Sequence, residues 1–240
     1  MGDIVKVSWS GGKDSTCATM LHLLRGDTVK AVCYIPMFTD TIPLLLKDHH
    51  EHILRTADKF RSMGAEVHIV TGMTYYDFVT HRITRGKNKG KIFGFPTPIT
   101  GMCEFKSYSK VSALKKLDVG YFDYEDIGIA SDEIKRLGQL NEKKRSILAE
   151  SGYTERDATN YCVSNHLLSP HYRHETRDGC ALCYNAPKQR RERWFSDYPE
   201  AREIVIQLQN LVKTERPDRT PLRNHQWFID TDHHQISFFD

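Results

Sequence analysis

The chain has 240 residues, of which 39% are hydrophobic and 27% charged. These proportions suit one domain with a small appendage, and they exclude a disordered or collagen-like chain. No stretch approaches the ~18 apolar residues of a membrane helix, and the first residues lack the pattern of a secretory signal. We therefore expect a cytoplasmic protein without membrane contact. A net charge of +3 says almost nothing about partners.

Apolar patterning predicts a strand over residues 4–9, then a helix that Gly26 closes. The apolar face of this helix is expected to comprise Cys17, Met20, Leu21 and Leu24. Further strands are predicted at residues 29–35, 66–70 and 126–130. Further helices are predicted at residues 50–63, 105–117, 154–166, 187–194 and 199–212, and residues 82–98 are expected to form a long loop.

The alternation of strands and helices is typical of a doubly wound, mainly parallel, Rossmann-like α/β sheet. Strand signals fade after about residue 152. We therefore expect residues 1–150 to form an α/β domain and residues 151–240 a helical, cysteine-bearing subdomain.

A glycine-rich segment joins the first strand to the first helix. It consists of Ser10, Gly11, Gly12, Lys13, Asp14 and Ser15. Two glycines let the backbone turn tightly and bring its N–H groups to an anion, and the helix adds its positive N-terminal end. Lys13 supplies a point charge, whereas Asp14 is better suited to hold Mg²⁺ or to orient the loop. The spacing differs from a Walker A loop, and its position favours a phosphate-binding loop over an ordinary serine- and glycine-rich turn.

This segment resembles the PP-motif of the PP-loop ATP pyrophosphatases, and the chain most resembles their phosphoadenosine phosphosulfate (PAPS) reductase-like branch. Three later segments are similar to that branch: Cys-Glu-Phe-Lys at residues 103–106, Gly-Ile-Ala-Ser-Asp-Glu-Ile-Lys-Arg at 128–136, and Gly-Cys-Ala-Leu-Cys at 179–183. The likeness spans about residues 4–200.

The resemblance implies that residues 1–150 are a PP-loop nucleotide-binding domain that takes ATP, or a related adenine nucleotide, with Mg²⁺. It further implies transfer of AMP to a substrate with release of pyrophosphate, usually to replace oxygen by sulfur or nitrogen. Residues 10–15 would grip the phosphates, with catalytic roles for Lys13, Asp14 and Arg136. Arg136 would make a second phosphate contact, and Asp132 and Glu133 would shape the site. The plainer alternative for residues 132–136 is a capped surface helix.

The cysteine spacing suggests a metal centre. Cys180-x-x-Cys183 is half of a tetrahedral thiolate site, and Cys103 and Cys162 could complete a Cys₄ site for a 4Fe–4S cluster or zinc. His166, His171 and His174 are alternative ligands. A redox dithiol, a chance pair and simple core filling remain open, and core filling is favoured for Cys17 and Cys33.

Two departures from the family affect the functional prediction. Cluster-bearing members usually have adjacent cysteines where Met102-Cys103 stands here. Sulfonucleotide reductases need a nucleophilic cysteine in a C-terminal tail, and no cysteine follows Cys183. An adenylating enzyme, most plausibly for sulfur transfer, is therefore preferred to a PAPS or APS reductase. The third hypothesis is a non-catalytic nucleotide- and metal-binding interaction protein.

The partners are less determined. The substrate could be a tRNA, DNA or a small metabolite, and a sulfur-donor protein and a homo-oligomer stay open. Basic residues are concentrated at residues 82–91 and 188–193 and could contact a polyanion. We favour the simpler interpretation of a solvated loop and an exposed helix face, because the overall charge is balanced.

Overall fold

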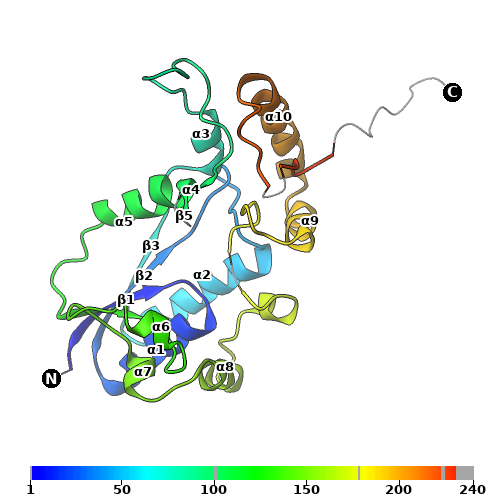
Figure 1. Ribbon diagram of the computed structural model, residues 1–240. Coiled ribbons are helices and arrows are strands. Elements are labelled where there is room, and N and C mark those ends of the chain that lie inside the picture. Colours follow the sequence, from blue (N-terminus) through cyan, green and yellow to red (C-terminus); the bar gives the residue numbers. More distant parts are fainter. Residues whose placement is uncertain (1, 100–101, 178, 223–224, 231–240) are drawn as a thin grey trace. The chain divides into compact units, whose positions relative to one another are not determined.

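The computed structural model describes residues 2–99, 102–177, 179–222 and 225–230. The chain forms two compact units that interleave in the sequence (Figure 1). Unit 1 comprises Met1–Ile35, Lys47–Val70 and Leu114–Asp178, and unit 2 comprises Pro36–Leu46, Thr71–Ala113 and Gly179–Asp240. Unit 2 takes its residues from two connections that leave the sheet of unit 1 and from the C-terminal part of the chain, and the domain boundary near residue 150 stays a prediction.

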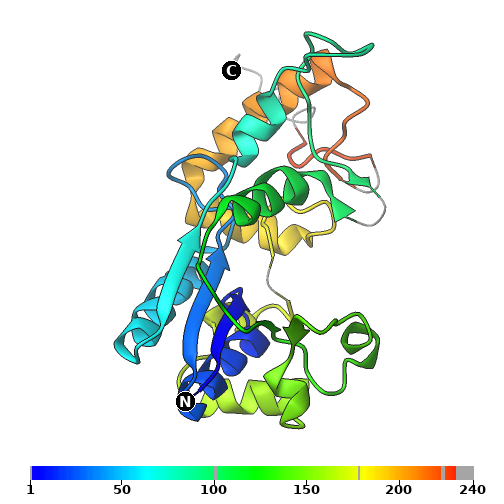
Figure 2. The ribbon, with the colours of Figure 1, turned by 90° about the vertical axis from the view of Figure 1, so that its left-hand side faces the viewer.

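Unit 1 is built on a parallel sheet of five strands, as the strand–helix alternation predicts. The strands are β1 (Ile4–Trp9), β2 (Thr28–Tyr34), β3 (Glu66–Val70), β6 (Tyr124–Ile127) and β7 (Lys144–Arg145). Their order in the sheet is β3-β2-β1-β6-β7, and each neighbouring pair is parallel. Figure 2 shows β2 and β3 lying side by side. If only the five strands of this sheet are numbered along the chain, their order is 3-2-1-4-5, which is consistent with a Rossmann-like fold.

The central position of β1 follows from its residues. Val5, Val7 and Trp9 alternate along the strand and are all buried. Val7 lies opposite Ala31 of β2 on one side and opposite Asp126 of β6 on the other. The order of the sheet thus runs outward in both directions from β1, so the loops after β1 and β6 open at the same edge.

Several helices accompany this sheet. They are α1 (Lys13–Arg25), α2 (Lys47–Ser62), α6 (Ile134–Leu137), α7 (Ile147–Glu150), α8 (Glu155–Ser164) and the 3₁₀ helix η2 (Pro170–Arg173). Helix α1 ends at Gly26, as predicted. Its expected apolar face is partly wrong, since Leu24 is 64% exposed whereas His22 is buried. His22 takes a buried position because its Nδ1 is hydrogen-bonded to the carboxylate of Asp27 at 2.7 Å, and its Nε2 lies 3.2 Å from the carboxylate of Asp126.

Unit 2 contains short elements around an aromatic core. They are α3 (Tyr75–Thr80), the antiparallel pair β4 (Pro98–Ile99) and β5 (Met102–Cys103), α4 (Glu104–Lys106), the π-helical turn η1 (Ser107–Val111), α9 (Lys188–Asp197) and α10 (Pro199–Glu215). Helix α5 (Ser112–Lys116) continues η1 across the division, so the predicted helix at 105–117 is a composite. The indole of Trp194 is fully buried and donates to the carbonyl of Pro43 at 2.9 Å.

Helix α9 differs from the expected exposed basic face. Arg190 and Arg191 are buried, together with Trp194 and Phe195. Charge density along the sequence could not reveal this, because long basic side chains can lie against apolar surface. In the described part of the chain, no helix is long and apolar enough to cross a membrane.

Candidate phosphate site

The loop between β1 and α1 needs glycine at position 11 for two reasons. Its φ angle is +78°, a conformation that residues with a Cβ atom rarely adopt. A Cβ atom at Gly11 would also overlap the side chain of Ile53 and lie 3.2 Å from Cε1 of His49. The loop is therefore packed closely against helix α2.

Hydrogen bonds between the two serines close the loop. The backbone N–H of Ser10 donates to Oγ of Ser15 at 3.1 Å, and the N–H of Gly12 donates to Oγ of Ser10 at 3.3 Å. The Ser15 hydroxyl donates in turn to the carbonyl of Gly12 at 3.2 Å. Both serines thus hold the turn in which Gly12 is the N-cap of α1.

Charged side chains gather at the start of α1. Nζ of Lys13 lies 2.9 Å from both carboxylate oxygens of Asp14 and 3.7 Å from Glu155 of α8. Burial raises the pKa of the Asp14 carboxyl, and the charges of Glu155 and Glu133 raise it further against the opposing effect of Lys13. The carboxylate of Asp14 is therefore held in surroundings that favour an additional cation.

The segment after β6 meets this loop at Gly128. A Cβ atom there would lie 2.6 Å from the backbone N of Ser15, so only glycine allows this approach of two backbones. Two segments that lie more than a hundred residues apart in the sequence thus come together at the carboxyl ends of β1 and β6.

The charged residues beyond Gly128 make contacts of different kinds. Glu133 accepts from the N–H of Ala130 at 3.2 Å and affects the pKa of Asp14, so it belongs to the site. Asp132 accepts from the N–H of Glu155 at 3.2 Å, which ties this segment to α8. Arg136 pairs with Glu133 at 2.6 Å and its side chain is 53% exposed. The contact of Arg136 with phosphate stays a prediction.

The structure adds Tyr172, Ser169 and His49, which the sequence analysis missed, and places beside them His171, which was predicted only as an alternative metal ligand. The hydroxyl of Tyr172 accepts from the backbone N–H of Lys13 at 3.2 Å. Oγ of Ser169 lies 2.9 Å from Nδ1 of His49 and 2.9 Å from Nδ1 of His171, and the two histidine rings are 4.4 Å apart. No local pattern marks this group, because its members come from α2 and η2, about 120 residues apart.

Two of the six cysteines pack beside the loop. The thiol of Cys162 in α8 donates to the carbonyl of Lys13 at 3.3 Å. Burial raises the pKa of Cys162 to about 12 and that of Cys17 to about 12. As neutral thiols they join α8 to α1, which agrees with the core interpretation left open for Cys162.

The other proposed ligands lie in unit 2. Cys180 and Cys183 form a turn in which the N–H of Cys183 donates to the carbonyl of Cys180 at 3.1 Å. Burial and the neighbouring Cys183 and Cys103 raise the pKa of Cys180 to about 12. Nevertheless, no three His, Cys, Asp or Glu side chains among the described residues are placed to hold one metal ion. Cys162 lies in unit 1 and the other three cysteines of the predicted site lie in unit 2, so the iron–sulfur or zinc centre stays a prediction on which nothing below depends.

Comparison with known proteins does not place the chain in a family. No protein-family model matches it, and no curated protein matches it. The fold itself is that of an α/β protein with a five-stranded parallel sheet of order 3-2-1-4-5.

Proposed function

We propose that the chain binds ATP, or a related adenine nucleotide, at residues 10–15 and transfers AMP to a substrate with release of pyrophosphate. The observation that carries this proposal is the contact between Gly128 and the first turn of α1. It joins the loops after two neighbouring strands where the order of the sheet reverses, and open α/β sheets bind nucleotides at such points. Helix α1 also presents its positive end there.

Backbone and hydroxyl donors are available for phosphate. The N–H groups of Gly12 and Lys13 are bonded to the hydroxyls of Ser10 and Tyr172. Exchange of these partners for phosphate oxygens would replace neutral hydrogen bonds by charge-assisted ones, which are roughly twice as strong. Nζ of Lys13 would likewise move from Asp14 to the phosphates.

The carboxylates of the site favour a nucleotide that carries a divalent cation. Asp14 and Glu155 lie beside Lys13, and the charge of Glu133 acts on Asp14, so a bare triphosphate would add to an excess of negative charge. Bound Mg²⁺ would supply positive charge to the triphosphate, and we assign Asp14 to hold it. This role agrees with the raised pKa of Asp14, which a cation would lower.

The proposed reaction needs no nucleophile from the chain. An oxygen of the substrate forms a bond to the α-phosphorus, the bond to the bridging oxygen of the β-phosphate breaks, and pyrophosphate leaves with the electron pair. The chain positions the phosphates and neutralises their charge through Lys13 and the loop amides. The adenylated oxygen then leaves as AMP when a sulfur nucleophile from a donor attacks. The second phosphate contact by Arg136 requires that its pair with Glu133 opens.

The test uses ATP labelled on the α-phosphate and the variant Lys13→Ala. Lys116→Ala is the matched control, because Lys116 is an exposed lysine of α5 away from the loop. We expect wild type and Lys116→Ala to form AMP and pyrophosphate, and Lys13→Ala to bind ATP about 10- to 100-fold more weakly, as loss of a hydrogen bond to a charged group implies. Formation of ADP and phosphate, or equal ATP affinity in the two variants, would refute the proposal.

A further inference from the structure

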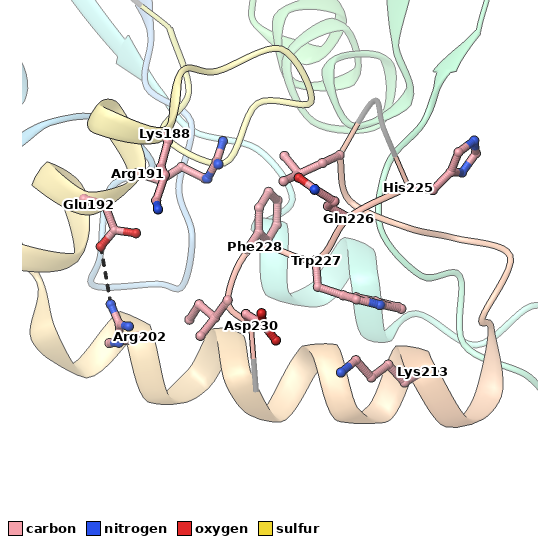
Figure 3. A pocket seen from close by; sticks show the side chains of 12 residues that line it. Lys188, Arg191, Glu192, Arg202, Lys213, His225, Gln226, Trp227, Phe228 and Asp230 are labelled. Carbon is pink, nitrogen blue, oxygen red and sulfur yellow. Dashed lines mark ion pairs between the residues drawn. The ribbon is translucent and has the colours of Figure 1, made fainter. Parts of the chain in front are cut away.

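Unit 2 contains a cavity of about 560 Å³ between α9, α10, Leu222 and residues 225–230 (Figure 3). Four of its lining residues are lysine or arginine, and two are acidic. The cations are Lys188, Arg191, Arg202 and Lys213, and the acids are Glu192 and Asp230. Its size and charge suit an anionic ligand larger than a single phosphate.

Arg191 is a buried cation that makes no ion pair with any residue that the structure describes, and the charge of the adjacent Glu192 offsets only part of the effect by which burial lowers its pKa. Its side chain donates from Nη1 to the carbonyl of Ala186 at 2.8 Å, and its guanidinium lies 5.8 Å from the centre of the Phe228 ring. Arg191 is only 7% exposed, and its Nε has no hydrogen-bond partner. A buried charge that is not neutralised is costly, so this position favours an anion.

Lys188 and Arg202 extend the positive charge beyond Arg191. Lys188 is exposed at the first residue of α9 and makes no ion pair with any residue that the structure describes. Arg202 lies 3.6 Å from Glu192, a weak pair that a phosphate could exchange. A second hollow on α9 shares Lys188 and Glu192 with the cavity and adds Arg193. The positive charge therefore follows the helix instead of ending at one pocket.

An aromatic ring lies in the same cavity. The indole of Trp227 is partly exposed, with Nζ of Lys213 5.4 Å from its centre and the ring of Phe95 edge-on at 6.3 Å. Figure 3 shows this indole and the cations of α9 and α10 around the same space. A flat aromatic surface beside phosphate-binding cations is the combination by which proteins hold unpaired nucleotides.

We propose that this cavity binds a nucleotide of a single-stranded nucleic acid, with its base on Trp227 and its phosphate at Arg191. The adjacent phosphate follows α9 past Lys188. A strand is favoured over a free nucleotide because the basic surface continues into the second hollow. The inference adds a partner to the function proposed for unit 1 and does not require ATP.

The experiment measures binding of the full chain to a fluorescein-labelled 12-nucleotide single strand, as RNA and as DNA, by fluorescence anisotropy without ATP. We expect Trp227→Ala to weaken binding about 5- to 100-fold, the range for loss of one stacked base, and Trp227→Phe to restore most of it. Lys188→Ala should weaken binding modestly and reduce the slope of log affinity against log salt by about 0.7. Arg191→Gln should weaken binding at least tenfold. Because Arg191 is buried and this variant could fail to fold, Trp227→Phe and Lys188→Ala carry the test independently.

Lys89→Ala is the matched control, since Lys89 is an exposed lysine of the other basic stretch. Unchanged binding in Lys89→Ala supports the cavity, whereas a loss equal to that of Lys188→Ala would assign binding to residues 82–91 and overturn the proposal. The proposal would also be overturned if wild type did not bind the oligonucleotide at 50 mM salt, or if Trp227→Ala bound it as tightly as wild type. UMP or inorganic phosphate could also compete as strongly as an unlabelled oligonucleotide at the same concentration of phosphate groups. That result would show that the cavity is a site for small anions and not for a strand. Because ATP is omitted, failure here leaves the adenylation test of Lys13→Ala unaffected.

Discussion

The contact between Gly128 and α1 can be tested by adding a single methyl group. In Gly128→Ala the new Cβ would lie 2.6 Å from N of Ser15, 2.7 Å from its Cα and 2.8 Å from C of Asp14. Non-bonded carbon atoms rest at about 3.5–4.0 Å. All three obstructing atoms are backbone, so no rotamer change relieves the overlap. The end of β6 and the start of α1 must therefore separate by about 1 Å.

The size of the effect follows from this displacement. Added methyl groups in well-packed sites cost about 1–3 kcal/mol. A misplacement of about 1 Å in a group that positions a substrate can lower the rate about 100-fold. We therefore expect Gly128→Ala to reduce the free energy of unfolding by about 1–3 kcal/mol and pyrophosphate release by about 100-fold.

Gly138→Ala is the control for this variant. Gly138 follows α6 with φ of −64°, and a Cβ there would meet nothing closer than 3.7 Å. Its free energy of unfolding should stay within about 0.5 kcal/mol of wild type. Urea unfolding measures the free energy of unfolding, an assay of released pyrophosphate measures the rate, and titration with a fluorescent ATP analogue measures the affinity. Equal stability and equal ATP affinity in the two variants would show that the close packing at Gly128 does not exist in solution, and the site assignment would fail.

Two further predictions concern groups around the sheet of unit 1. Burial alone raises the pKa of Asp27, but hydrogen bonds from Arg25 and His22 outweigh it, so its pKa is lowered in the folded state. Asp27 therefore stabilises the fold above the unfolded pKa of about 3.9, and this stabilisation is lost as the pH falls through the lower folded pKa. The destabilisation by Asp27→Asn should be constant from pH 5 to 7 and shrink below about pH 4 in thermal unfolding; a difference that does not change with pH would contradict the ion pairing. Because burial raises the pKa of Cys17 and Cys162 to about 12, iodoacetamide at pH 8 should label both in urea but neither in the native chain, as mass spectrometry of peptides would show. Native labelling of Cys162 at the rate found in urea would exclude its packing against the loop.

Several elements were predictable because their signals are local. Strand β1, residues 10–15 and helix α1 follow one another with turn and closing glycines at the expected positions. Helix α8, predicted at residues 154–166, begins at Glu155 after the N-cap Thr154, which forms a capping box with Asp157. Short elements such as α3 and β7 were missed, because the six residues of α3 make less than two helical turns and β7 has only two residues.

Side-chain roles were less predictable. The basic residues of α9 were expected to face solvent, yet Arg191 is buried because the helix turns that side toward Phe228 and the carbonyl of Ala186. The predicted metal ligand Cys162 packs at the contact between α8 and α1, where its thiol donates to the carbonyl of Lys13. In both cases the residue type was compatible with two environments, and only packing distinguishes them.

The parallel α/β class and the phosphate loop are thus properties of short stretches of sequence, since hydrophobic period and glycine conformation depend on near neighbours. The tertiary structure alone decides which distant segments complete the loop. Gly128 reaches Ser15 only because β6 pairs with β1, and Tyr172 reaches Lys13 only through the chain reversal after α8. These contacts join residues more than a hundred positions apart in the sequence. The distance in space between such residues depends on the order of the strands in the sheet, which local sequence patterns do not determine.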